Sequence, residues 1–172
     1  MKRRLTMSLN KQDVVITRVF DFSVELVWKA WTNPSLVMQW WGPAHYTSPR
    51  CEIDFREGGK FLFCMRAPDS HGGQESYSAG IYKVIKPLER LEFNQYLSDA
   101  NGNYIDPAEA GLPSDFPSNV EFVIEFSSIG ERTELKITEY GWTPGEMLKY
   151  ALLGMNQSLD KLAERIGPMN LS

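Results

Sequence analysis

The side chains that most often carry out chemistry, cysteine and histidine, are sparse in this sequence. Its 172 residues include two cysteines, Cys51 and Cys64, and two histidines, His45 and His71. These four residues lack the spacing of a metal site. A Cys or Ser nucleophile needs a base within hydrogen-bond reach, whereas both histidines fall in predicted loops. Neither a G-x-G-x-x-G nor a G-x-x-x-x-G-K-[ST] motif occurs, so nothing indicates a nucleotide site. We predict no metal, no cofactor and no catalytic residue of these types.

The acidic residues Glu52 and Asp54 could form a pair for acid–base catalysis. They alternate with apolar residues in the stretch 51–66, which predicts a β-hairpin whose acidic side chains lie on the solvated face. A three-residue loop would set Phe55 opposite Phe61, Ile53 opposite Phe63 and Cys51 opposite Met65. The two cysteines then face opposite sides of the sheet, which excludes a disulfide between them.

Aromatic residues and methionines are more promising than the acids and thiols. Aromatic residues make up 12% of the chain, with five Trp, and many should converge between a sheet and the C-terminal helix. Each could simply fill the core; together they indicate a mostly apolar cavity, the usual form of a small-molecule site. Tyr150, Asn156 and Gln157 would supply polar groups. The predicted ligand-binding residues are Trp31, Trp41, Phe61, Phe63, Met65, Phe122, Trp142, Met147, Tyr150, Gly154 and Gln157.

The element that must position these residues is a helix predicted over 144–166. Apolar residues recur in it at three- and four-residue spacing, from Leu148 to Ile166. In its first half Met147, Ala151 and Leu153 widen this stripe, and a helix that is apolar most of the way round should be enveloped. A curved sheet could do this.

Alternating patterns predict seven strands and two short helices before the long helix. The strands are expected at 13–20, in the two arms of the hairpin 51–66, and at 76–86, 91–97, 120–126 and 133–140. The short helices are expected at 24–31, with Ser23 as N-cap, and at 34–39. The long connection 98–119 could act as a lid. The fold class is therefore α+β, a twisted antiparallel sheet around a helix.

Composition limits the setting of the protein. Its length fits one domain at 13–167, with a disordered or tag-like segment at 1–12 and a tail at 168–172. The net charge of −4 argues against nucleic acid as a partner, and no apolar run suits membrane insertion. Two cysteines without a secretory signal indicate the cytoplasm.

Four stretches together carry a family resemblance: RVFDFSVELVWKAWTNPSLVMQWWGP, REGGKFLFCMRAPD, GIYKVIKPLERLEF and GMNQSLDKLAERI. They resemble the AHSA1-like family, named after the activator of Hsp90 ATPase, within the START/Bet v 1-like (SRPBCC) superfamily. The resemblance implies a helix-grip fold, with a seven-stranded antiparallel sheet around the C-terminal helix and a hydrophobic cavity between them. It does not imply a reaction.

Three functions remain open from the sequence. The first is binding of a small hydrophobic or amphipathic ligand, a lipid or an aromatic metabolite. The second is a cyclase- or hydrolase-like enzyme, which needs an acid or base inside the same cavity. The third is an interaction module for an Hsp90-type chaperone partner. Exposed sheet edges would also allow a homodimer.

Overall fold

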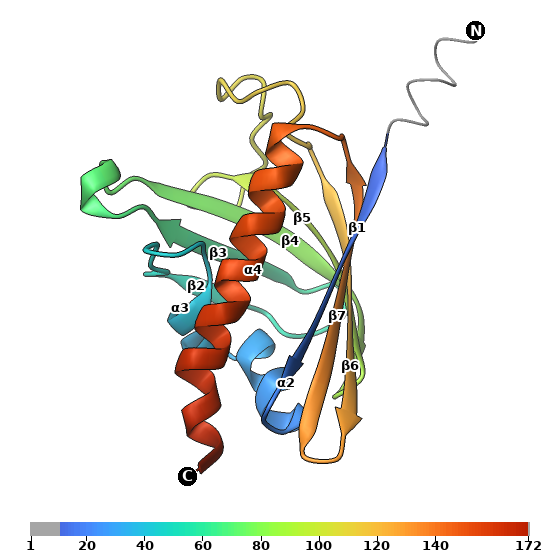
Figure 1. Ribbon diagram of the computed structural model, residues 1–172. Helices are drawn as coiled ribbons and strands as arrows, with labels where there is room; N and C mark the ends of the chain where they lie inside the picture. The colour runs from blue at the N-terminus through green and yellow to red at the C-terminus, as the bar shows by residue number, and fades with distance from the viewer. Residues whose placement is uncertain (1–10, 172) are drawn as a thin grey trace, which may run out of the picture.

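A seven-stranded antiparallel sheet curves around one long helix in the computed structural model, which describes residues 11–171 (Figure 1). The strand order is β1-β7-β6-β5-β4-β3-β2. This confirms the predicted α+β helix-grip architecture, with two short helices after the first strand. The elements are β1 Gln12–Phe20, α2 Val24–Thr32, α3 Pro34–Trp40, β2 Cys51–Ile53, β3 Lys60–Arg66, η1 Asp69–His71, β4 Glu75–Lys86, β5 Arg90–Ser98, β6 Val120–Ile129, β7 Arg132–Trp142, α4 Glu146–Ile166 and η2 Gly167–Leu171.

Regular structure therefore extends slightly past both predicted domain boundaries, into β1 at the start and η2 at the end. Most of the predicted N-terminal segment, residues 1–10, lies outside the described residues. Among the described residues, none of the helices combines the length and the hydrophobicity that a membrane span requires.

The two short helices begin where the sequence supplies N-caps. Ser23 Oγ accepts a hydrogen bond from Leu26 N at the start of α2, and Asn33 Oδ1 accepts one from Ser35 N at the start of α3. At the end of α3 two adjacent tryptophans diverge, as expected from helix geometry. Trp40 is fully buried and donates its Nε1 hydrogen to Ala30 O, whereas Trp41 leaves the helix as its C-cap.

The hairpin of β2 and β3 differs from its predicted register by two residues. Cys51 pairs with Phe63, and Ile53 pairs with Phe61. The chain leaves β2 early because Asp54 N donates to Lys60 O at 2.9 Å, which closes a longer turn than three residues. A shift of two residues keeps every side chain on its predicted face, so the cysteines still point to opposite sides. Both are buried and free, including Cys64, which the hairpin pattern had placed on the outer face with Lys60 and Arg66.

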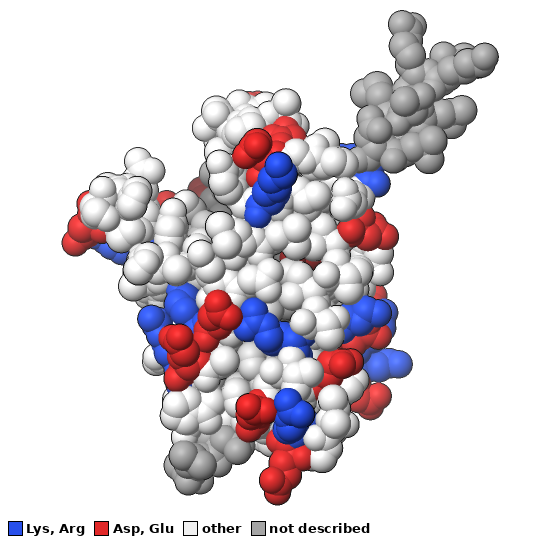
Figure 2. All heavy atoms as spheres, in the orientation of Figure 1, with Lys and Arg blue, Asp and Glu red and all other residues white. Residues whose placement is uncertain are grey.

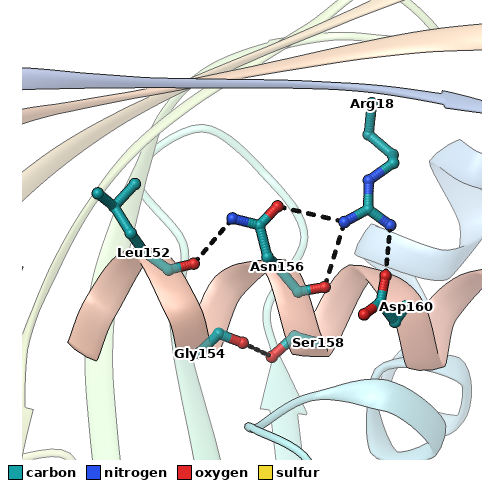
Figure 3. A network of polar contacts seen from close by, with 6 residues as sticks. All are labelled: Arg18, Leu152, Gly154, Asn156, Ser158 and Asp160. Carbon is teal, nitrogen blue, oxygen red and sulfur yellow. Dashed lines mark hydrogen bonds and ion pairs between the residues drawn. The ribbon is translucent and has the colours of Figure 1, made fainter. Parts of the chain in front are cut away.

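The C-terminal half of α4 is held from one side by β1. Arg18 Nη1 forms an ion pair with Asp160 at 2.8 Å, and Arg18 Nη2 donates to the backbone and side-chain oxygens of Asn156 at 3.3 and 3.2 Å (Figure 3). Asn156 thus faces β1. It does not supply a polar group between the sheet and the first turns of α4, as the sequence had suggested.

The other side of α4 is bonded to the backbone of the segment 39–46. Ser158 Oγ donates to Gly42 O at 2.8 Å, Lys161 Nζ to Tyr46 O at 3.0 Å and Arg165 Nη1 to Gln39 O at 2.8 Å. These bonds all come from the part of the helix after Gly154. They fix that part against the sheet and the short helices, while its apolar residues fill the core.

Candidate ligand-binding cavity

A cavity of about 580 Å³ lies between the N-terminal half of α4 and the concave face of the sheet. Its wall comes from the segment after α3, from the strands β3 to β7, from α4, and from Leu112, Phe116 and Pro117 of the loop 99–119. In Figure 1 this loop lies over the start of α4. The volume is within the range of small-molecule sites. Beside this half of the helix the visible surface carries few charges, whereas charges of both signs surround the C-terminal half (Figure 2).

Most of the predicted ligand-binding residues line this cavity. Seven of the eleven do so: Trp41, Met65, Phe122, Trp142, Met147, Tyr150 and Gly154. They come together because the inward face of the sheet and the widened apolar stripe of α4 meet at the open end of the curve.

The other four predicted residues lie elsewhere. Trp31 is 2% exposed and packs against Trp40, with ring centroids 4.8 Å apart. Phe61 and Phe63 point inward but pack against each other, with centroids 4.8 Å apart, so they fill the core beneath the cavity. Gln157 turns away, because its Oε1 accepts a hydrogen bond from Ala44 N at 3.0 Å.

The cavity contains a buried acid that sequence reasoning missed. Glu139 of β7 is 4% exposed and accepts a hydrogen bond from Trp142 Nε1 at 3.0 Å through Oε1. Burial raises the pKa of this carboxyl to about 7, although the bond from Trp142 acts in the opposite direction. The sequence pattern that could have predicted this burial is the inward alternation of Leu135 and Ile137, because its next position is Glu139.

A β-bulge explains how Glu139 and Trp142 both reach the cavity. Val14 of β1 pairs with Glu139, and Gln12 pairs with Trp142, so β7 has one extra residue between these two pairs. The extra residue reverses the alternation of the strand. Gly141 lies in this stretch with φ of +97°, a backbone conformation that suits glycine. Two residues three positions apart therefore share one face.

The remaining polar groups of the wall are uncharged. Gln95 Nε2 donates to Ser78 Oγ at 2.8 Å, and both residues line the cavity, as do Tyr46, Tyr77 and Tyr96. No lysine, arginine or histidine belongs to the wall that the described residues form, and Glu139 is the single charged side chain of that wall.

The thiols and imidazoles take no part in the cavity. Burial raises the pKa of Cys51 to about 12 and also raises the pKa of Cys64, which leaves both unsuited to act as nucleophiles. His45 and His71 lie in a turn and in the short helix η1. Among the described residues, no three His, Cys, Asp or Glu side chains are grouped so that they could hold a metal ion.

A contact between Asp115 and the first turn of α4 holds the loop over the cavity. Asp115 Oδ2 accepts a hydrogen bond from Met147 N at 3.2 Å, where the N-cap residue, Gly145, offers no side chain. A carboxylate here satisfies a free backbone N–H and favours the helix dipole. A β-carbon on Gly145 would lie 2.6 Å from Asp115 Oδ2, so glycine leaves room for this contact.

We expect Asp115→Ala to loosen this loop. Loss of the cap should lower the free energy of unfolding by about 1 kcal/mol and speed amide hydrogen exchange in residues 106–118. Hydrogen exchange with mass spectrometry and urea unfolding would measure both effects. Glu109→Ala, which removes an exposed acid of the same loop, is the matched control. Equal exchange in the two variants would show that Asp115 does not hold the loop.

Comparison with known proteins gives a family and a fold. The family described as activator of Hsp90 ATPase homolog 1-like protein matches residues 21–167. No curated protein matches the chain.

Several solved structures share this architecture. A Nitrosomonas europaea protein is 22% identical with a TM-score of 0.73, covering 93% of this chain and 97% of its own. A Chromobacterium violaceum protein is 22% identical with a TM-score of 0.70, covering 90% and 96%. The AHSA1-like protein from Aeromonas hydrophila is 18% identical with a TM-score of 0.69, covering 94% and 96%. Because these sequence identities are low, the similarity shows a shared fold and carries no information about function. Because the family match spans all of α4 and every strand of the sheet except β1, the chain belongs to the AHSA1-like family within the START-like (SRPBCC) superfamily.

Proposed function

We propose that the protein binds a small hydrophobic or amphipathic molecule, a lipid or an aromatic metabolite, in the cavity beside the N-terminal half of α4. The observation that supports this is the cavity of about 580 Å³ with a wall of mainly aromatic and aliphatic side chains. Such a space would normally be filled in a well-packed core. The loop 99–119 would cover the ligand, and Asp115 would hold the loop in place.

A ligand panel tests this function directly. Native mass spectrometry with fatty acids, fatty alcohols, fatty amines and bicyclic aromatic compounds should reveal at least one complex with one ligand per chain. Trp41 and Trp142 line the cavity, so the same ligand should change the intrinsic tryptophan fluorescence. We expect a dissociation constant of about 10 µM or lower for the best compound, given the apolar area available. A panel without a single 1:1 complex would contradict the proposal.

A second candidate is an acid–base enzyme that uses the same cavity. Glu139 favours it, because a buried carboxyl with a pKa near 7 is suited to proton transfer at neutral pH. Gln95, Ser78 and the cavity tyrosines could orient a substrate but are not bonded to Glu139. We rank binding first, because the wall formed by the described residues holds this one acid and no basic partner for it. An interaction with an Hsp90-type chaperone is supported only by the family description.

A further inference from the structure

The charge on the cavity wall is of one sign, negative. Its lining includes one charged residue, Glu139, and no basic residue among those the structure describes. A carboxylate or phosphate inside this space would meet a buried acid and no basic side chain of the wall, because the buried Lys161 behind it is bonded to Tyr46 O. Such an arrangement is costly in a medium of low dielectric constant. Ligands with an anionic group are therefore the ones that this wall rejects.

Only one of the two carboxyl oxygens of Glu139 has a hydrogen-bond partner among the described residues. Its Oε1 accepts the hydrogen bond from Trp142, while its Oε2 has no hydrogen-bond partner in the part of the chain that the structure describes. Oε2 is nevertheless accessible, because it is absent from the described polar atoms that are both sealed from water and without a partner. This agrees with an atom that is open to the cavity, which Glu139 lines. A polar group on a residue that is 4% exposed normally has its bonds satisfied. This accessible oxygen can therefore accept a hydrogen bond from a donor group on a ligand.

The surroundings of Glu139 are suited to a cation. Phe122 lies directly opposite Glu139 in the pairing of β6 with β7, and Trp142 contacts its carboxyl group. Trp41, Tyr77 and other aromatic side chains complete the wall. Aromatic faces attract an ammonium group, most strongly where it is removed from water. A buried carboxylate among aromatic rings is thus complementary to an amine with an apolar body.

We propose that the cavity binds an amphipathic amine, whose ammonium group pairs with Glu139 Oε2 while its aliphatic or aromatic body fills the apolar space. This inference rests on the proposed binding function and names the chemical class of its ligand. The amine supplies both the missing hydrogen-bond donor and the missing counter-charge. A neutral alcohol supplies only the donor, and a carboxylate supplies neither.

Three probes with one apolar body and different polar groups test this inference: 2-(2-naphthyl)ethylamine, 2-(2-naphthyl)ethanol and 3-(2-naphthyl)propanoate. Their affinities would be measured by calorimetry at pH 8, where Glu139 is mostly ionised. We expect the amine to bind at least about tenfold more tightly than the alcohol, and the carboxylate to bind most weakly. In Glu139→Gln the amine should lose about tenfold or more, while the alcohol changes less than about threefold.

Glu146→Gln is the matched control, because Glu146 is an exposed acid in the first turn of α4, near the same cavity. It should leave all three affinities unchanged if the effect comes from Glu139 and not from the general field of the protein. Three outcomes would overturn the inference and leave the binding function standing. They are equal affinities of the three probes for the unchanged protein, tightest binding of the carboxylate, and a preference for the amine that survives in Glu139→Gln. If none of the three probes nor any compound of the ligand panel binds, the binding function fails and the inference fails with it.

Discussion

Glu139→Gln should make the protein more stable at alkaline pH than the unchanged chain. In the unfolded state this carboxyl ionises with the ordinary glutamate pKa of 4.5, whereas burial raises the pKa in the folded state to about 7. Between these two values the folded state binds more protons than the unfolded state, so the free energy of unfolding falls as the pH rises. The difference between the two pKa values corresponds to about 3 kcal/mol in the free energy of unfolding. This contribution is fully lost above the folded-state pKa.

Glutamine removes this titration while keeping a side-chain oxygen that can accept the hydrogen bond from Trp142. The stability of Glu139→Gln relative to the unchanged protein should therefore rise by about 2–3 kcal/mol between pH 4 and pH 8. Urea unfolding followed by circular dichroism at several pH values would measure it. Glu131→Gln alters an exposed acid of the β6–β7 turn, and its free energy of unfolding should change with pH in the same way as that of the unchanged protein. Parallel curves for Glu139→Gln as well would show that this carboxyl is not buried in the folded protein.

The prediction about Glu139 also shows where sequence reasoning reached its limit. The strands and helices were predictable because their hydrophobic periods are clean, as in β6, where Val120, Phe122, Ile124 and Phe126 alternate and are all buried. In β7 the same alternation ends on an acid, which pattern reasoning assigns to solvent. The bulge that brings Trp142 beside that acid is a feature of strand pairing and has no period of its own.

Two other differences have similar causes. The register of β2 and β3 depends on how the turn at 54–59 closes its backbone hydrogen bonds, and the glycines there permit several closures. Gln157 lies on the helix at a position where it could face the cavity, but a backbone N–H of the segment 39–46 captures its side chain. Helical spacing predicts the face of a residue, whereas a partner far along the chain decides where a polar side chain turns.

Gly154 offers the sharpest test of whether the cavity itself is the binding site. Glycine within a helix costs about 1 kcal/mol relative to alanine, yet this one lies in the middle of α4 and lines the cavity. A β-carbon at this position would meet only Pro43 Cγ, at 3.4 Å, which is an ordinary contact. Alanine should therefore be accepted here, whereas a larger side chain has to extend into the space beside Pro43.

We expect Gly154→Leu to weaken binding of the best ligand from the panel by about fiftyfold or more, because the added side chain occupies ligand volume. Gly154→Ala should keep the affinity within about threefold and raise the free energy of unfolding by up to about 1 kcal/mol. Calorimetry would give the affinities, and urea unfolding would confirm that both variants fold. The pair separates ligand exclusion from a change in helix stability, since both substitutions improve the helix but only leucine fills the cavity. Ligand binding by Gly154→Leu with unchanged affinity would place the bound molecule outside this cavity and remove the main support for the proposed function.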